Sequence, residues 1–361
     1  MTKSAVLYDF LLESGGAESV TFALSSILDQ AEIYTDFNLQ DKASNQLDGQ
    51  INELGRPLHS RLLRYILGIR HFKARTKFLN NVDQVFYSGT TAPCAVHNNP
   101  SGQNIHYCHT PPRFIYDLNN FVMAGIPTWQ KPFAKQLFSY IQHHYESSVS
   151  RMDLTLCNSA TVRDRLSKYL NINASVIHPP CNTENYKWIS QGDYFLSTAR
   201  LEPYKRVELL IKAFMKMPDK RLIVTSGGSQ FDQLKKMASG HENIKFSGWV
   251  QKDVLIKLMG ESLASIYIPI EEDFGISPVE SMAAGKPVIG VAEGGLKETV
   301  LDNETGLLLK SAPSENDVIE AVNQFSTDRA LSMRTACEKQ AAKFSDEIFK
   351  TKILSAIESV S

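Results

Sequence analysis

The strongest constraint in this sequence is a regular alternation of short apolar runs with stretches of helical spacing. Runs typical of buried strands occupy residues 6–8, 84–87, 104–108, 154–157, 175–177, 194–198, 221–225, 243–246, 265–268 and 287–291. Helical patterns separate most of them, and the first extends from Glu18 to Leu28. Bounded apolar strands that alternate with helices are typical of parallel sheets covered on both faces. The pattern predicts an α/β protein with doubly wound sheets.

Chain length and two prolines predict two domains. Single hydrophobic cores stop growing at roughly 250–300 residues, and this chain has 361. Pro179 and Pro180 disfavour continuing either type of element, and a new series of strands and helices starts at Tyr194. We expect two Rossmann-like domains, at residues 1–183 and 184–343. The helical stretch 344–361 could pack on either, including back onto the first.

Composition limits the partners. A formal net charge of -1 gives no global field that would favour nucleic acid, so no nucleic-acid partner is expected. No apolar run approaches the ~20 residues that span a bilayer, and the N-terminus lacks the pattern of a signal peptide. The five cysteines are scattered, without a CxxC pair. Reduced, buried thiols in a cytoplasmic protein without a zinc site are expected.

One segment of the first half is strongly basic. No acidic residue lies between Glu53 and Asp83, while that stretch carries Arg56, Arg61, Arg64, Arg70, Lys73, Arg75 and Lys77 among apolar residues. One interpretation is an amphipathic helix with a solvated basic face. The other is attachment of Arg56 to Lys77 to an anionic leaflet, peripherally on the inner face of the cytoplasmic membrane, where each basic residue adds roughly 1 kcal/mol.

The segment 271–280 combines acidic residues with helix-start signals. It follows the run 265–268 and precedes Gly285, which suits a left-handed helix end. Ser277 suits an N-cap, Pro278 the first helical position, and Glu280 the end of a capping box. Glu280 has that purely structural interpretation, but ligands of doubly wound sheets bind at the carboxyl ends of the strands. A helix N-terminus at that place would be well suited to bind a diphosphate.

A second segment places cations where local propensity disfavours them. The run 194–198 leads to Arg200, then to a tight loop and to Lys205, which is expected to open a helix. Basic groups at a helix N-terminus oppose its macrodipole. Two cations beside a diphosphate would stabilise the charge that develops as it leaves. The alternative is a surface loop whose cations meet only solvent.

Together these two segments resemble glycosyltransferase family 4, which has the GT-B fold and retains the configuration of the transferred sugar. The order and spacing of Arg200, Lys205, Glu272 and Glu280 match that family's signature, and the resemblance covers nearly the whole chain. It implies that Arg200 and Lys205 hold the diphosphate, that Glu272 contacts hydroxyls of the transferred sugar, and that Glu280 contacts the ribose. It also implies that the sugar and phosphates lie near the backbone amides of Phe274, Gly275 and Ile276.

In the first half, the resemblance points to a glycine pair and a histidine. Gly15 and Gly16 lie between a strand and a helix, where the absence of side chains admits the donor phosphates; turns use such pairs as well. His109 ends a strand ahead of two prolines, in a run similar to the His-Thr/Ser-Pro-x-Arg of O-antigen-type sugar transferases. It could contact the donor sugar or the acceptor hydroxyl. Arg113 and Tyr116 could line the acceptor site or serve packing.

Two further loops could border the nucleotide, although ordinary turns explain them almost as well. Gly227 follows the run 221–225, and Val250 follows Gly248 after the run 243–246. A third glycine pair, Gly294 and Gly295, opens another helix, and its role is left open.

The resemblance implies transfer of a hexose from a nucleotide-sugar to a lipid-linked glycan acceptor of surface polysaccharide such as O-antigen. GDP-mannose is the first expectation for the donor and a UDP-hexose the second, with no cofactor and no metal. Other interpretations are a nucleotide-sugar epimerase, a phosphorylase, or a non-catalytic sugar-nucleotide-binding subunit of a glycan assembly complex. A nicotinamide dehydrogenase is less favoured because the glycine pair does not complete GxGxxG.

Overall fold

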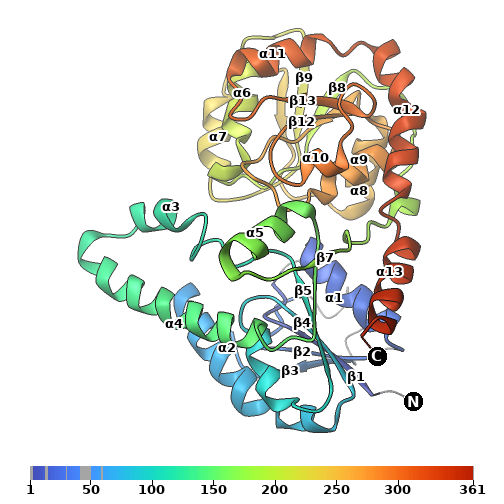
Figure 1. The fold of residues 1–361 in the computed structure, drawn as a ribbon. Helices are drawn as coiled ribbons and strands as arrows, with labels where there is room; N and C mark the ends of the chain where they lie inside the picture. Colours follow the sequence, from blue (N-terminus) through green and yellow to red (C-terminus); the bar gives the residue numbers. More distant parts are fainter. Residues whose placement is uncertain (1–2, 13–14, 30, 41–49, 58–59, 361) are drawn as a thin grey trace. The chain divides into compact units, whose positions relative to one another are not determined.

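The computed structural model describes residues 3–12, 15–29, 31–40, 50–57 and 60–360, without the side chains of residues 61 and 62. It divides into two compact units, each built on its own sheet (Figure 1). Unit 1 contains Met1–Pro179 and Phe349–Ser361, and unit 2 contains Pro180–Ile348. The last turns of the C-terminal helix therefore belong to unit 1.

The described residues of unit 1 form a parallel sheet of seven strands in the order β3-β2-β1-β4-β5-β6-β7. The strands are β1 (Ser4–Tyr8), β2 (Glu32–Thr35), β3 (Ile51–Glu53), β4 (Gln84–Ser88), β5 (Gln103–Cys108), β6 (Leu154–Cys157) and β7 (Ser175–Val176). Neighbouring residues of β1 pack into different apolar clusters: Val6 lies with Phe349, and Leu7 lies with Phe72. Both faces of the sheet are thus covered, which explains the continuous apolar runs of its strands.

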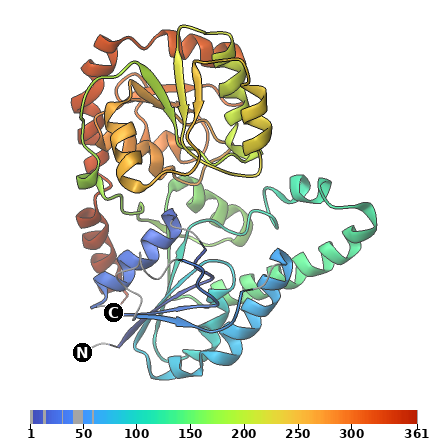
Figure 2. The ribbon, with the colours of Figure 1, turned by 180° about the vertical axis from the view of Figure 1, so that it is seen from behind.

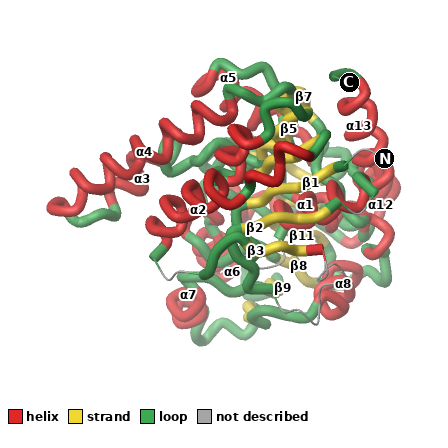
Figure 3. The backbone as a smooth tube through the Cα atoms, turned by 90° about the horizontal axis from the view of Figure 1, so that it is seen from below, coloured by secondary structure: helices red, strands yellow, loops and turns green. Residues whose placement is uncertain are grey.

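Helices and shorter helical turns connect these strands (Figure 2). They are α1 (Gly16–Ile27), α2 (Arg61–Arg75), η3 (Lys77–Asn81), η4 (Ala92–Asn98), α3 (Asn119–Ala124), η5 (Thr128–Gln130), α4 (Lys131–Val149), α5 (Ala160–Leu170) and α13 (Asp346–Glu358). The α3–α4 hairpin extends from the sheet of unit 1 beyond α2, as Figures 1 and 3 show.

Unit 2 forms a parallel sheet of six strands in the order β10-β9-β8-β11-β12-β13. The strands are β8 (Tyr194–Ser197), β9 (Arg221–Val224), β10 (Ile244–Phe246), β11 (Ala264–Ile266), β12 (Val288–Val291) and β13 (Gly306–Leu309). The strand order reverses between β8 and β11, which lie side by side. This arrangement is that of a dinucleotide-binding sheet, and its reversal point is where ligands of such sheets bind.

The helices of unit 2 also lie on both faces of its sheet. They are η6 (Thr183–Asn185), η7 (Pro203–Lys205), α6 (Val207–Met215), α7 (Phe231–Met237), α8 (Lys252–Glu261), α9 (Ile276–Ala283), α10 (Leu296–Thr299), α11 (Glu315–Asn323) and α12 (Thr327–Ala342). Phe195 belongs to the main core of the unit, whereas its neighbour Leu196 packs into a smaller cluster with Met259.

The predicted α/β class with doubly wound parallel sheets is confirmed. The sequence interpretation missed β2, β3 and β13, which are short. All five cysteines are buried, and none of them forms a disulfide with another described residue. Among the described residues, no helix has the length and apolar character that crossing a membrane requires.

Candidate functional site

The two segments singled out in the sequence meet at the reversal point of the unit 2 sheet. The segment that carries Arg200, Lys205 and Arg206 follows β8. The acidic loop, residues 268–275, follows β11. A backbone hydrogen bond of 2.8 Å from the Ile270 N–H to the Tyr204 carbonyl joins them. The carboxyl ends of both strands therefore present their polar side chains at one place.

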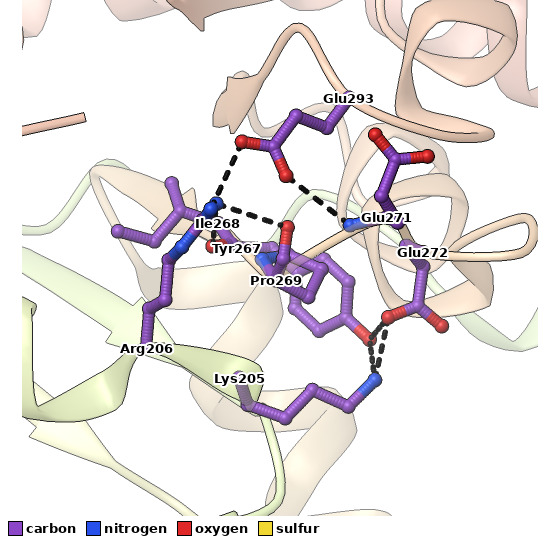
Figure 4. A network of polar contacts seen from close by, with 8 residues as sticks. All are labelled: Lys205, Arg206, Tyr267, Ile268, Pro269, Glu271, Glu272 and Glu293. Atoms are coloured by element: carbon purple, nitrogen blue, oxygen red, sulfur yellow. Dashed lines mark hydrogen bonds and ion pairs between the residues drawn. The ribbon is translucent and has the colours of Figure 1, made fainter. Parts of the chain in front are cut away.

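Lys205 and Glu272 form the centre of this site (Figure 4). The Lys205 ammonium lies 2.5 Å from the Glu272 carboxylate and 3.1 Å from the Tyr267 hydroxyl. That hydroxyl also donates to the same carboxylate at 3.0 Å. The sequence predicted the lysine and the glutamate but missed Tyr267, which lies within the run 265–268 and has the pattern of a core residue.

The electrostatics of Lys205 favour a fixed positive charge. Burial by itself would lower its pKa, but Tyr267 and Glu272 outweigh burial and raise the pKa above its usual range. The side chain is only 14% exposed, so its charge is weakly screened. A charged, partly desolvated ammonium is suited to an anionic ligand.

Lys205 does not open a helix, which corrects the sequence prediction. It ends the short turn η7, and α6 begins at Val207. Arg206 intervenes with a left-handed φ of 56°, which breaks the helical path between them. The lysine is therefore placed by a turn that the left-handed residue terminates, and no helix dipole opposes it directly.

Arg206 fixes the acidic loop in place through side-chain contacts (Figure 4). Its guanidinium pairs with Glu293 at 3.0 Å and donates to the carbonyls of Ile268 and Pro269 at 3.4 Å. The Glu293 carboxylate in turn accepts from the Glu271 N–H at 3.2 Å. Although burial raises the pKa of Glu293, its hydrogen bonds from Ala312, Arg206 and Glu271 lower it on balance. This pair positions the loop that carries Glu272.

Gly294 and Gly295, whose role could not be assigned from the sequence, have a packing role in the structure. A Cβ atom at Gly294 would lie 2.1 Å from the Glu272 carbonyl oxygen, and one at Gly295 would lie 2.5 Å from the Asp273 carbonyl oxygen. The Gly295 N–H donates to that Glu272 carbonyl at 2.7 Å. Only residues without a side chain allow this loop to lie directly against the acidic loop.

The Arg206–Glu293 pair gives a stability prediction. Arg206→Ala should lower the free energy of unfolding by about 2 kcal/mol, because it leaves the buried Glu293 carboxylate unpaired. Arg206→Gly loses the same pair but relieves the left-handed backbone, so it should be about 1 kcal/mol more stable than Arg206→Ala. Urea titrations of the full chain measure both. Equal stability of Arg206→Ala and the unchanged protein would contradict a role for this pair.

Helix α9 begins at Ile276, two residues before the position that the predicted start signals give, and the predicted capping box is wrong. Gly275 is the N-cap, with a φ of 92°, and no side chain caps the helix. Ser277 and Pro278 lie inside the first turn, where a missing proline N–H costs no intrahelical bond. The left-handed position predicted for Gly285 is confirmed by its φ of 68°. Ile276 and Ser277, both partly buried, thus form the N-terminus of α9 directly after the acidic loop.

Glu280 is anchored within unit 2. Its carboxylate accepts from the Tyr186 hydroxyl at 2.6 Å. Burial raises its pKa, against hydrogen bonds from Tyr186 and Ser277. Its contact with a ribose stays a prediction.

The other predicted residues of unit 2 fall into two groups. The Arg200 side chain is exposed and makes no hydrogen bond or ion pair with the part of the chain that is described, so its guanidinium is accessible to a ligand. Gly227 lies against Trp249, since a Cβ atom there would lie 2.3 Å from the indole nitrogen. Val250 follows this tryptophan and is partly buried, whereas the Phe274 side chain is in the core, 3% exposed. Phe274 can offer a ligand only its backbone.

In unit 1, His109 follows β5 and contacts the end of β1. Its ring lies edge-on to Tyr8 at 6.3 Å, and the Tyr8 hydroxyl donates to Glu18 in the first turn of α1 at 3.3 Å. Gly15 and Gly16 begin that same helix. The histidine and the glycine pair therefore share one edge of the sheet. Burial lowers the pKa of His109 to about 4, and its Nε2 atom is buried without a hydrogen-bond partner in the described structure.

Arg113 and Tyr116 take part in contacts within unit 1. Arg113 pairs with Asp117 at 2.9 Å, and the Tyr116 hydroxyl donates to Glu146 at 2.9 Å. These contacts favour the packing interpretation over the acceptor one. In the portion of the chain that is described, no three His, Cys, Asp or Glu residues cluster so as to hold a metal ion.

Residues 182–344 match the family described as Glycosyl transferases group 1. This range lies within unit 2 and contains Arg200, Lys205, Glu272 and Glu280. The match therefore covers nearly all of unit 2.

Curated relatives match part of the chain at low identity. The human GDP-Man:Man(3)GlcNAc(2)-PP-Dol alpha-1,2-mannosyltransferase is 24% identical in an alignment 253 residues long, which covers 62% of this chain and 51% of that protein. An alpha-1,3/1,6-mannosyltransferase of Dictyostelium discoideum is 27% identical in an alignment 273 residues long, which covers 62% of each chain. The chain thus spans about half to three-fifths of the length of these relatives.

Solved structures match over the whole chain. Anabaena HepE in complex with UDP and glucose has a TM-score of 0.78 at 16% identity, covering 99% of this chain and 100% of that one. Sucrose-phosphate synthase from Thermosynechococcus elongatus has a TM-score of 0.79 at 15% identity, with coverages of 100% and 99%. The predicted GT-B fold is confirmed. The domain match and these folds together support a GT-B glycosyltransferase.

Proposed function

We propose that this protein is a retaining family 4 glycosyltransferase that moves a hexose from a nucleotide-sugar to a lipid-linked glycan. The observation that carries the proposal is the pairing of Lys205 with Glu272 at the reversal point of the unit 2 sheet. One cation and one carboxylate there suit the two ends of a sugar diphosphate. The accessible Arg200 adds a second cation to the same segment.

Donor binding would exchange partners within this pair. The Lys205 ammonium would turn to the diphosphate, and the Glu272 carboxylate would accept hydroxyls of the sugar. Tyr267, which contacts both groups, would keep a hydrogen bond to Glu272. The N-terminus of α9 would add a partial positive charge.

Transfer would follow a same-face substitution. The bond between the anomeric carbon and the phosphate oxygen breaks as the acceptor hydroxyl oxygen attacks from the side on which the diphosphate leaves. The departing phosphate oxygen takes the hydroxyl proton. Lys205 and Arg200 would stabilise the charge on the leaving group, and the protein would otherwise act by positioning. His109, which its low pKa keeps neutral at pH 7, would offer a hydrogen bond to the donor sugar or to the acceptor hydroxyl.

GDP-mannose is the proposed donor and alpha-mannosyl transfer the proposed reaction. Relatives that are named as mannosyltransferases, one of them with GDP-Man in its name, support the choice. HepE, whose structure contains UDP and glucose, keeps a UDP-hexose as the second candidate. For the acceptor we propose a lipid-linked glycan of lipopolysaccharide O-antigen or another surface polysaccharide.

We further propose that the protein works in the cytoplasm, peripherally on the inner face of the membrane. The basic segment from Arg56 to Lys77 supports this, although several of its side chains have partners within unit 1. Lys73 contacts His144 at 2.9 Å, and Arg75 donates to the Leu54 carbonyl. Arg70 and Lys77 are exposed.

The direct test incubates the protein with GDP-mannose or with UDP-glucose, each with and without a lipid-linked glycan extracted from a bacterial membrane. The proposal expects sugar transfer only when the acceptor is present. The anomeric configuration of the transferred sugar in the product should be the same as in the donor. Release of the sugar without an acceptor, or inversion of its configuration, would count against it.

Glu272→Ala should slow transfer about tenfold, ~1.4 kcal/mol of barrier, while nucleoside diphosphate binding changes by less than about threefold. The reason is that the carboxylate would meet the sugar and not the diphosphate. Steady-state kinetics and calorimetric titration with GDP separate the two effects. Equal losses in transfer and in GDP affinity would refute a sugar contact. Glu271→Ala is a suitable control, because this neighbouring residue is exposed and the substitution keeps the backbone N–H that donates to Glu293.

A further inference from the structure

The α3–α4 hairpin of unit 1 exposes an unusual set of aromatic side chains. Phe121, Trp129 and Phe133 are 62%, 73% and 71% exposed. They are three of the four most exposed large apolar side chains in the described structure. We call these three residues the aromatic tip. Exposing so much apolar surface in one hairpin is unfavourable in water, and contiguous patches of this kind mark interaction sites.

Helix α4 has two apolar stripes, and only one of them is used by the fold. Ala134, Phe138, Ile141 and Tyr145 recur at helical spacing and are buried. Phe138 packs edge-on against Phe114 at 5.3 Å, which fixes α4 on unit 1. Phe133 and Tyr140 lie seven residues apart on another side of α4 and are exposed, and the exposed Trp129 precedes them in η5. The second stripe is therefore not needed to hold the helix in place.

The charge around the tip has one sign. Residues 118–145 contain Lys131 and Lys135 and no Asp or Glu. The neighbouring α2 lies in a second stretch, residues 54–82, that also lacks acidic residues. A hydrogen bond of 2.9 Å between Lys73 of α2 and His144 of α4 joins the two helices, and His144 stacks edge-on with Tyr140 at 4.5 Å. The exposed stripe of α4 thus continues toward the basic helix.

We propose that the aromatic tip inserts into the headgroup region of an anionic lipid leaflet while Lys131, Lys135 and the exposed cations of α2 contact its phosphates. Aromatic side chains beside lysines, without acidic residues, have the chemistry of an element that lies in a membrane interface. A complementary protein surface would have to be both apolar and strongly acidic. The inference deepens the proposed function, because a lipid-linked acceptor is presented at such a surface.

The tip differs from the basic segment in what it predicts. Charges alone give binding that salt abolishes, whereas inserted aromatic rings give binding that persists in part. The tip also places the apolar anchor in a segment outside Arg56 to Lys77. Both contributions can be measured separately by changing rings or charges.

The test is co-sedimentation of the full chain with vesicles of phosphatidylcholine and phosphatidylglycerol in equal parts, and with vesicles of phosphatidylcholine alone. Neither donor nor acceptor is present, so the result does not depend on transfer. The unchanged protein should bind the anionic vesicles. The double variant Trp129→Ala, Phe133→Ala should bind at least about tenfold more weakly, ~1.4 kcal/mol. Its thermal unfolding should be unchanged, because both rings are exposed.

The matched control is Leu331→Ala with Leu354→Ala, which removes two apolar side chains that are 40% and 39% exposed on other helices. It should bind as the unchanged protein does. In a charge variant, Arg70→Gln with Lys77→Gln, affinity should fall about fivefold per charge in low salt. Trp129→Phe should keep the binding and lose the blue shift of tryptophan fluorescence that vesicles induce.

The outcomes separate clearly. Loss of vesicle binding in the tip variant, with binding kept in the control, supports the proposal. Equal binding of the tip variant and the unchanged protein would overturn it, and so would equal binding to neutral vesicles. If the protein binds neither vesicle and the tip variant instead abolishes self-association in sedimentation, the tip is a contact between copies and the proposal is wrong. Transfer activity on a soluble acceptor could survive any of these results.

Discussion

Lys205→Ala should slow sugar transfer on the order of a hundredfold, which is ~2.7 kcal/mol of barrier, and by no less than about tenfold. The expectation follows from the environment of the Lys205 ammonium. The side chain is largely buried, so solvent screens its charge little, and its raised pKa keeps it charged. Its loss removes charge stabilisation from a leaving diphosphate. It also leaves the Glu272 carboxylate with the Tyr267 hydroxyl as its remaining partner among these three groups. Rates measured at saturating donor and acceptor test it.

A matched control is Lys212→Ala. Lys212 lies one helix further along, is 43% exposed, and pairs with Glu208 at 2.7 Å on the surface of α6. Surface pairs of this kind contribute little, so transfer should be unaffected. If Lys205→Ala retained the full rate, the assignment of this residue to the diphosphate would have to be abandoned.

Acidification should destabilise the protein by about 4 kcal/mol between pH 7 and pH 5 through two histidines of β5 and its end. Burial lowers the pKa of His106 to about 3 and that of His109 to about 4. An unfolded histidine titrates near 6.5, so between that pH and the folded pKa values the unfolded chain binds more protons. Stability is therefore present above about pH 6.5 and is lost progressively as the pH falls toward 4. Urea titrations at the two pH values measure the difference.

The variant His106→Leu isolates the contribution of His106 to this pH-dependent loss of stability. His106 is fully buried, and neither ring nitrogen has a hydrogen-bond partner in the described structure. Leucine is of similar size and cannot titrate, so the pH-dependent loss should shrink by about 2 kcal/mol. His143→Gln, at an exposed position on α4, should leave the loss unchanged. An undiminished loss in His106→Leu would show that this histidine is not buried in its neutral form.

The long apolar runs were predictable because both faces of each sheet are covered. Strand β12 is buried throughout, and its sequence is continuously apolar. Strand β4 is also buried throughout, and its apolar run 85–87 lies between the buried polar residues Gln84 and Ser88. Two of the missed strands, β3 and β2, lack this signature, whereas the third, β13, has it over four residues and was overlooked. The edge strand β3 is largely exposed, and β2 alternates between buried and exposed positions over only four residues. Local sequence does not reveal such strands, because pairing with a neighbour creates them.

The helix starts near the site were predicted less well, for a physical reason. Start signals were read from side-chain caps, whereas α6 and α9 both follow residues with left-handed backbone, Arg206 and Gly275. Arginine at such a position carries no local signal. The pairing of Arg206 with Glu293 involves residues 87 positions apart, and only the fold brings them together.

Of the candidate site, sequence order and spacing anticipated Lys205 and Glu272, which the structure places in contact. Tyr267 and the packing role of Gly294 and Gly295 were not anticipated. A tyrosine within an apolar run has no feature in the sequence that distinguishes it from a core residue. A glycine pair likewise does not reveal what lies against it.

The most direct test of the central claim is the thermal stabilisation of the full chain by GDP, UDP and dTDP, measured for the unchanged protein and for the variant Arg200→Ala, Lys205→Ala. At a concentration about a hundredfold above Kd, a specific nucleotide should stabilise the unchanged protein by about 2.7 kcal/mol. GDP should have the largest effect, and the variant should lose most of it. Equal stabilisation of both proteins, or none by any nucleotide, would contradict a diphosphate site at the reversal point of the unit 2 sheet.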